Sequence, residues 1–121
     1  MNTSTSKVLI VNDSGHDFSK ATMFGPLVIM TKGMVNRFNV TQMFRIFEPF
    51  IRASYPHDYI LHTGPGVMTA VACSMFAARH GRINLLLWRG EEDGEDKYVY
   101  RRLTLNRLSE KEEISNDTYT R

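Results

Sequence analysis

The sequence predicts a small α/β fold of Rossmann-like type. We expect a three-layer sandwich around a mostly parallel sheet of about four strands, with an antiparallel strand at its C-terminal edge. Short aliphatic runs alternate with segments of helical periodicity, and turn signals rich in Gly, Asn and Asp separate them. The 121 residues, 42% of them hydrophobic, are enough for one core.

Five short runs are the expected strands. Four are nearly continuous in apolar residues, which is typical of parallel strands buried on both faces. The fifth alternates and follows a polar turn, so it predicts the second arm of a hairpin. In order, the ranges are 7–11, 27–30, 59–62, 83–88 and 97–105.

Three segments between these runs have helical character. Residues 17–24 predict a short helix. Asn39 is a good N-cap for a second helix, in which Pro49 predicts a kink or a division into two short helices. Its apolar residues recur at spacings of three and four: Val40, Met43, Phe44, Phe47, Phe50 and Ile51. Residues 65–80 predict the third helix, with a proline at its start and a glycine after its end.

Composition and charge limit the domain organisation, the partners and the location that we expect for the protein. We expect a disordered N-terminus (1–6), a single domain (7–108) and a polar tail (109–121). The net charge of +2 without a strong basic cluster argues against nucleic acid as a partner. No run is long and apolar enough to span a membrane, and no secretory signal is recognised. Cys73 stands alone, so we expect no disulfide or metal site and a cytoplasmic location.

Polar residues gather where three of the predicted strands end. In α/β sheets, ligands bind outside the carboxyl ends of the strands. If the three strands are parallel neighbours, the three loops meet at one edge and form a candidate ligand site. The candidate residues in these loops are Asn12, Asp13, Ser14, His16, Thr31, Lys32, His62, Thr63, Gly64 and Gly66.

The turn between His62 and Met68 has two interpretations. Glycines at a helix N-terminus allow a phosphate to approach unpaired backbone N–H groups, and the helix dipole favours the negative charge. Alternatively, Gly64-Pro65-Gly66 only turns a buried strand into a helix. The small residues of the following helix suit close packing on the sheet in either case.

Individual side chains carry similar alternatives. Lys32 could neutralise a phosphate or be solvated, and Asp17 could contact a ribose or cap the short helix. His62 and Asp13 are the candidates for acid–base catalysis, although a structural role fits both. We expect His57 at the surface and Cys73 in the core. Core packing is also the default for Trp88, with contact to a ligand as the alternative.

The stretch TGPGVMTAVACSMFAARHGRINLLLW resembles the first glycine motif of the SLOG superfamily. That superfamily includes the LOG cytokinin-activating phosphoribohydrolases and the lysine-decarboxylase-like proteins. Residues 63–68 fall on its pattern GGGPGxM, with Thr63 in place of a glycine. The resemblance covers residues 59–88. It implies a Rossmann-like fold that binds nucleotide-type ligands, with backbone contacts to phosphate from Gly64, Gly66, Val67 and Met68.

The second LOG motif, PGGxGTxxE, whose glutamate takes part in glycosidic-bond cleavage, has no counterpart after Trp88. This difference favours a ligand-binding relative without catalysis over a phosphoribohydrolase. The compact size, the methionine-rich helix and the polar tail also resemble small bacteriophage proteins, which would place the chain in the host cytoplasm.

Three functions follow from these observations. The first is non-catalytic binding of a nucleotide-type or other phosphorylated small ligand at the carboxyl edge of the parallel strands, with no cofactor established. The second is an interaction protein that oligomerises through the helix from Val40 to Ile51 or binds a host protein. The third is a nucleotide-processing enzyme of phosphoribohydrolase type that uses His62 or Asp13.

Overall fold

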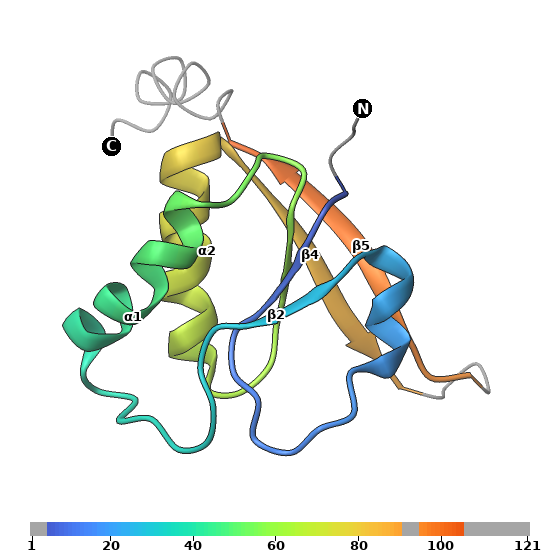
Figure 1. Ribbon diagram of the computed structural model, residues 1–121, viewed down its shortest axis with the longest axis horizontal. Coiled ribbons are helices and arrows are strands. Elements are labelled where there is room, and N and C mark those ends of the chain that lie inside the picture. Colours follow the sequence, from blue (N-terminus) through green and yellow to red (C-terminus); the bar gives the residue numbers. More distant parts are fainter. Residues whose placement is uncertain (1–4, 91–94, 106–121) are drawn as a thin grey trace, which may run out of the picture.

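The computed structural model describes residues 5–90 and 95–105. Within these two ranges, the elements follow one another in this order (Figure 1): β1 (Val8–Ile10), the 3₁₀ helix η1 (Ser19–Phe24), β2 (Leu27–Ile29), α1 (Val40–Arg52), β3 (Tyr59–Leu61), α2 (Gly66–His80), β4 (Arg82–Arg89) and β5 (Lys97–Thr104). The predicted N-terminal and C-terminal tails, 1–6 and 109–121, lie outside the described residues except for positions 5 and 6.

One five-stranded sheet organises the fold, with the strand order β2-β1-β3-β4-β5. β1 is parallel to both β2 and β3, β3 is parallel to β4, and β5 is antiparallel to β4. The predicted α/β class and the antiparallel edge strand are confirmed. Because β1 lies between β2 and β3, the three parallel strands are neighbours, as the predicted site requires.

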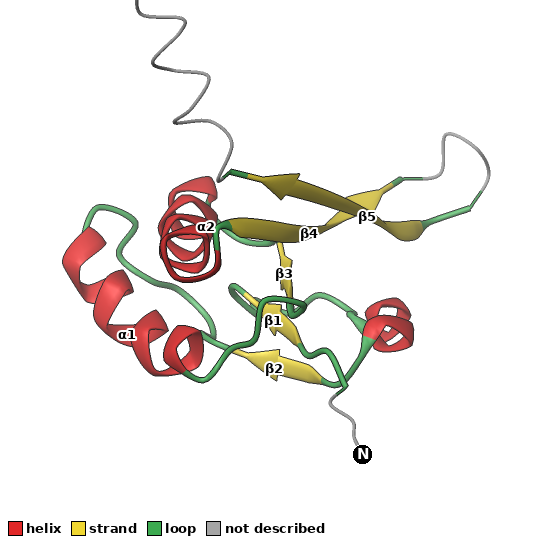
Figure 2. Ribbon diagram, turned by 90° about the horizontal axis from the view of Figure 1, so that it is seen from above, coloured by secondary structure: helices red, strands yellow, loops and turns green. Residues whose placement is uncertain are grey.

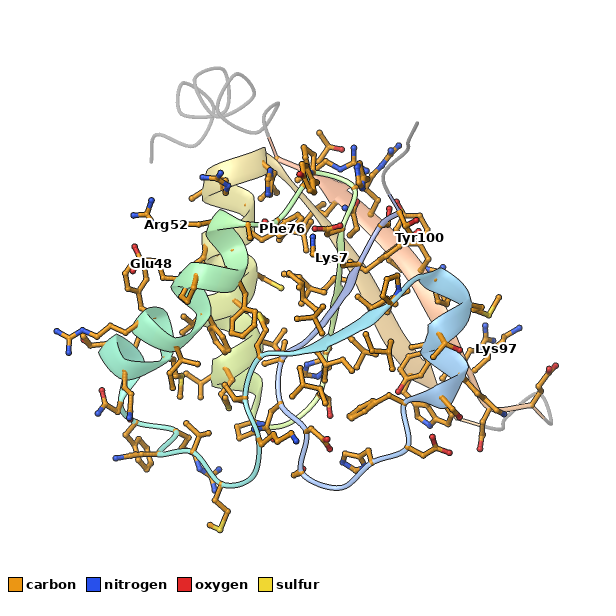
Figure 3. All side chains as sticks on the ribbon, in the orientation of Figure 1. Lys7, Glu48, Arg52, Phe76, Lys97 and Tyr100 are labelled. Atoms are coloured by element: carbon orange, nitrogen blue, oxygen red, sulfur yellow. The ribbon has the colours of Figure 1, made fainter. Side chains whose placement is uncertain are left out.

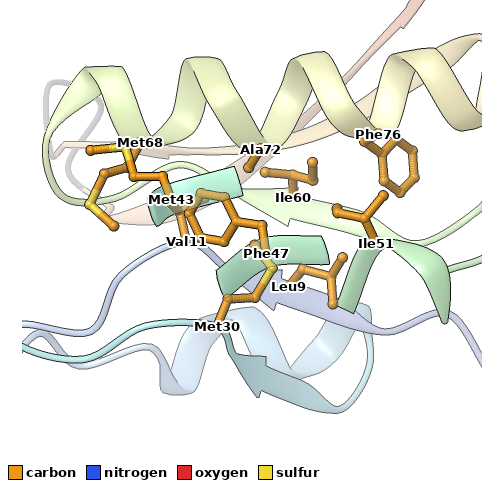
Figure 4. Close-up of a cluster of buried hydrophobic side chains, with 10 residues drawn as sticks. All are labelled: Leu9, Val11, Met30, Met43, Phe47, Ile51, Ile60, Met68, Ala72 and Phe76. Carbon is orange, nitrogen blue, oxygen red and sulfur yellow. The ribbon is translucent and has the colours of Figure 1, made fainter. Parts of the chain in front are cut away.

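The helices form a layer on each face of the sheet (Figure 2). α1 and α2 cover one face together, and η1 lies on the other. Two clusters of buried side chains fill the space between the layers. The larger lies under α1 and α2 and is drawn in Figure 4: Leu9, Val11, Met30, Met43, Phe47, Ile51, Ile60, Met68, Ala72 and Phe76. The smaller lies under η1: Val8, Ile10, Phe18, Ala21, Leu61 and Leu86.

The ends of α1 and α2 follow local sequence signals. The Asn39 side chain accepts the Gln42 amide at 3.0 Å and caps α1. α2 ends at Gly81, whose φ of 73° is left-handed and whose amide donates to Ala77. Among the described residues, no helix has the length and apolar character needed to cross a membrane.

Three details differ from the predictions. α1 runs as one helix through Pro49, so the division into two short helices is wrong; Pro49 is exposed, and its carbonyl still accepts the Ala53 amide. α2 begins at Gly66, with Pro65 as its N-cap rather than as its first residue. The helix expected over 17–24 is a 3₁₀ helix that begins at Ser19, because Asp17 precedes it and accepts the Ser19 amide at 2.9 Å.

Candidate functional site

A pocket of about 490 Å³ opens at the carboxyl end of β3, on the η1 side of the sheet. Four parts of the chain contribute to it: the loop after β1 with η1, the loop after β3, the end of β4, and the start of β5. Its lining residues are His16, Asp17, Phe18, Lys20, His62, Thr63, Trp88, Asp96 and Tyr98. The predicted residues His16, His62 and Thr63 therefore share one cavity.

Aromatic side chains form one wall of this pocket. The rings of Trp88 and Tyr98 meet edge to face with their centroids 4.9 Å apart, because the β4–β5 register places these two residues opposite each other. Trp88 is 48% exposed, so the default expectation of core packing is wrong for this residue. Burial, followed by the nearby Asp17 carboxylate, raises the pKa of Tyr98. The Tyr98 hydroxyl thus keeps its proton and can donate to a ligand.

The two histidines of the pocket are exposed. His62 Nδ1 lies 2.7 Å from the Thr69 hydroxyl, one helical turn inside α2. This contact fixes the direction of the His62 ring, so its second nitrogen is the one available to a ligand. His16 packs its ring edge to face on Phe18, with 6.2 Å between the centroids.

Charges in the pocket lining are mixed. Lys20 Nζ donates to the backbone carbonyl of Asp96 at 3.0 Å and so connects η1 to the start of β5. The hydrogen bonds from Ser19 hold the pKa of Asp17 below its usual value, so Asp17 is a carboxylate at neutral pH. One lysine faces two aspartates, and the lining has no net positive charge when its histidines are neutral.

The glycine turn adjoins the pocket through Thr63. Its two glycines differ in how much space a side chain would have. Gly64 has a φ of 85°, and a Cβ added there would lie 2.8 Å from the Cβ of Asn12. Gly66 opens α2, and a Cβ added there would meet no atom within 4 Å. Gly64 therefore has a packing reason to be glycine, whereas Gly66 leaves open space at the helix N-terminus.

A second group of predicted residues lies where β1 and β2 end and does not line the pocket. Asn12 is buried, and its amide donates to the Thr31 hydroxyl at 2.8 Å and to the Gly33 carbonyl at 3.0 Å. The Thr31 hydroxyl donates to the Val11 carbonyl at 2.7 Å. These side chains hold the two loops together, and neither lines the pocket.

The remaining predicted residues lie near these groups without lining the pocket. Asp13 accepts the amide of Gly15 at 3.0 Å, and its own backbone pairs with Lys32 in an isolated parallel bridge. Ser14 and Lys32 are exposed. The Met68 side chain is fully buried and Val67 packs against the same core, so only their backbone faces the turn.

Two further expectations concern residues outside the site. His57 is exposed, as predicted. Cys73 lies in α2, where it is half-buried against the larger core cluster, and its burial raises the pKa of the thiol to about 11. The thiol is therefore protonated and a poor nucleophile at neutral pH.

Sequence reasoning missed four lining residues: Phe18, Lys20, Asp96 and Tyr98. Lys20 and Phe18 belong to a 3₁₀ segment whose position over the sheet has no local sequence signal. Tyr98 had a usable signal. A hairpin was predicted between the strand ending at Trp88 and the strand beginning at Lys97, and antiparallel pairing places the first residues of one arm beside the last of the other.

A buried polar cluster at the opposite end of the sheet was also missed. Asp58 has no exposed surface and accepts three hydrogen bonds of 2.8 Å, from the Lys7 amide, Lys7 Nζ and the Tyr55 amide. Asn84 donates to the carbonyls of Pro56 and Asp58. Figure 3 labels Lys7 at this end and Lys97 toward the pocket end. The cluster satisfies its own polar groups, which indicates a structural role.

These features define a small α/β protein of Rossmann-like architecture, with an aromatic pocket at the carboxyl edge of its parallel strands. The chain belongs to the phage Pam3 gp32-like protein family, whose model matches residues 6–105. The sequence-based expectation of a small bacteriophage protein is thereby confirmed. Comparison with curated proteins and with solved structures returned no match.

Proposed function

We propose that this protein binds a nucleotide-type ligand without turning it over. In this proposal the base and sugar occupy the pocket, and the phosphate lies at the N-terminus of α2. The observation that carries it is the half-exposed Trp88, held against Tyr98 in a pocket whose rim continues through Thr63 into the glycine turn. A planar ring of a ligand can pack on these aromatic side chains.

The charge distribution supports this orientation of the ligand. The pocket lining carries Asp17 and Asp96 against Lys20, which does not favour a phosphate inside the pocket itself. The start of α2 offers the backbone N–H groups of Gly66 and Val67 and the positive end of the helix dipole, whereas the predicted contact from the Met68 amide is already used, because this amide donates to the Pro65 carbonyl at 3.0 Å. Gly66 adds no Cβ there, so the backbone is accessible to an anion. The SLOG-like motif of residues 63–68 agrees with this assignment.

Binding without turnover is the form of the proposal that the geometry supports best. Asp13 does not line the pocket, and its carboxylate accepts the Gly15 amide. His62 does line it, but its Nδ1 contacts the Thr69 hydroxyl, and that hydroxyl is not an acidic group that would strengthen a catalytic base. The enzymatic alternative consequently rests on His62 alone.

Trp88 provides a direct test because it is the only tryptophan of the chain. Titration with nucleoside monophosphates should change its fluorescence and raise the melting temperature. The matching nucleosides should change the fluorescence with weaker affinity, and inorganic phosphate should leave it unchanged. The proposal is excluded if neither the nucleoside monophosphates nor their nucleosides change the Trp88 fluorescence or the melting temperature.

Two variants separate the phosphate from the ring. Gly66→Asp places a carboxylate at the helix N-terminus and should remove the advantage of nucleotides over nucleosides. Gly90→Asp is the matched control, because a Cβ at Gly90 also meets no atom within 4 Å and the residue lies outside the turn. If both variants bind nucleotides as the unchanged protein does, the phosphate does not bind at α2.

A second candidate function is association through α1, within the host cytoplasm. Half of the six apolar residues predicted on this helix serve the core, since Met43, Phe47 and Ile51 are buried. Phe44 is 45% exposed and lines a shallow groove of about 540 Å³ between α1 and α2. Light scattering of the purified protein tests this function. A dimer that Phe44→Asp dissociates would support it, and a monomer would exclude self-association.

A further inference from the structure

The β4–β5 hairpin is longer than the rest of the sheet and is strongly basic. Each of its strands has eight residues, whereas β1, β2 and β3 have three each. The two strands carry five cationic residues and no acidic one: Arg82, Arg89, Lys97, Arg101 and Arg102. β5 is the edge strand, and Figure 2 shows it at the margin of the sheet opposite β2.

Strand alternation sorts the hairpin side chains into two faces. Leu86 and Tyr98 pack in the cluster under η1, whereas Leu85 packs in the cluster under α2. The register pairs Leu85 with Arg101, Leu87 with Val99, and Ile83 with Leu103, and paired residues share a face. Arg101, Val99 and Leu103 therefore lie on the α2 side of the sheet.

On this side, basic and aliphatic residues alternate along β5. We call Lys97, Val99, Arg101, Leu103 and the neighbouring Leu87 the basic sheet face. Leu103 is 53% exposed, and Val99 and Leu87 are partly exposed. α2 packs on β4, and among the described residues no helix covers β5 here. Apolar side chains on the face of an edge strand mark an interaction surface when they stay uncovered.

We propose that the basic sheet face binds an acidic segment of a partner protein. Side chains of the same face recur about every 6.8 Å along a strand, so Lys97 and Arg101 present two charges with Val99 between them. A segment that alternates carboxylates and aliphatic side chains complements both features. Nucleic acid fits less well, because this face has phosphate-binding charges but no aromatic ring on which bases stack.

Adjacent residues of β5 provide matched variants for the test. Arg101 and Arg102 are both exposed, but they lie on opposite faces of the strand. The probe is a fluorescein-labelled synthetic peptide in which leucine and glutamate alternate and glutamate is the only charged residue. Fluorescence anisotropy measures its binding to the full chain. Binding should weaken as salt rises, because its charged contacts are screened.

We expect Arg101→Glu to weaken binding of the glutamate peptide about tenfold and Arg102→Glu to leave its binding nearly unchanged. A peptide with lysine in place of glutamate should not bind. The proposal is wrong if the glutamate peptide does not bind, or if the two variants lose the same affinity for it. It is also wrong if a single-stranded DNA oligonucleotide binds as tightly as the peptide. Binding that appears only after Glu112 and Glu113 are changed to lysine would also overturn it, by assigning the face to the chain's own acidic segment. These outcomes do not depend on the nucleotide pocket.

Discussion

Gly64 packs against Asn12 so closely that a Cβ on the glycine would lie 2.8 Å from the Asn12 Cβ. Asn12 cannot move away easily, because it is buried and its amide bonds to Thr31 and Gly33. The glycine turn, which suggested a phosphate site, is therefore also a joint between the loops after β1 and β3. One of its glycines serves this joint, and the other serves the proposed ligand.

This division predicts different costs for the two glycines. Gly64→Ala combines a left-handed φ of 85° with the clash against Asn12, and should lower the free energy of unfolding by about 2 kcal/mol or more. Gly66→Ala meets open space in a helix and should be neutral or slightly stabilising. Urea unfolding followed by circular dichroism measures both. Equal stability of the two variants would show that the joint with Asn12 carries little energy.

The buried Asp58 predicts a second large effect, at the other end of the sheet. Asp58→Ala removes the partner of Lys7 Nζ and leaves the amides of Lys7 and Tyr55 unsatisfied, so it should cost about 3–5 kcal/mol of stability. The control is Glu48→Ala, because Glu48 and Arg52 form an exposed ion pair at 2.9 Å, close to the 2.8 Å between Lys7 and Asp58. That variant should cost less than about 1 kcal/mol. Similar losses would contradict a structural role for burial at Asp58.

The strands and α2 could be predicted because their signals are local. The run from Val8 to Ile10 is apolar throughout because both faces of β1 are buried, and Gly81 ends α2 in the left-handed conformation that glycine adopts readily. The convergence of loops also followed from general topology. The rule that loops after parallel strands meet at one edge placed His16, His62 and Thr63 close together, and the three residues do line one pocket. This prediction did not require the strand order to be known.

The rest depended on contacts between distant segments. Nothing near Asp58 in the sequence signals burial, because its partner Lys7 lies 51 residues away. Asn12 and Thr31 were predicted to bind a ligand. In the sequence, a polar side chain at a strand end gives the same signal whether it bonds to a ligand or to a neighbouring loop, as Asn12 does. Trp88 was expected inside because the sequence does not reveal that β4 extends past its parallel neighbour β3.

His80 predicts a pH dependence of stability. Burial, followed by the nearby Arg79 charge, lowers its pKa, and its Nε2 lies 2.8 Å from the Ser54 hydroxyl. The unfolded chain therefore takes up this proton at a higher pH than the folded chain does. Between the two pKa values the unfolded state binds more protons, so stability is lost as the pH falls through this range.

Unfolding free energies measured from about pH 7.5 down to about pH 5 test this dependence. His80→Gln, which keeps a donor for Ser54, should flatten the decline seen in the unchanged protein. His16→Gln is the control, since His16 is exposed in the pocket. A decline that His80→Gln leaves unaltered would assign the pH dependence to other groups.

Cys73 predicts slow thiol chemistry in the folded protein. Its burial raises the pKa of the thiol to about 11, so the reactive thiolate is scarce at pH values near 8. Iodoacetamide should modify the folded protein on the order of a hundredfold more slowly than a free cysteine, since thiolate content falls tenfold for each unit of pKa. Mass spectrometry of timed samples gives the rate of modification, and unfolding in urea should raise this rate to that of a free cysteine.

As the control, Ser74→Cys in a Cys73→Ser background moves the thiol one residue, to an exposed position of α2, and should react quickly. If the two thiols react at the same rate, α2 opens faster than the reagent attacks, and burial of Cys73 does not protect it.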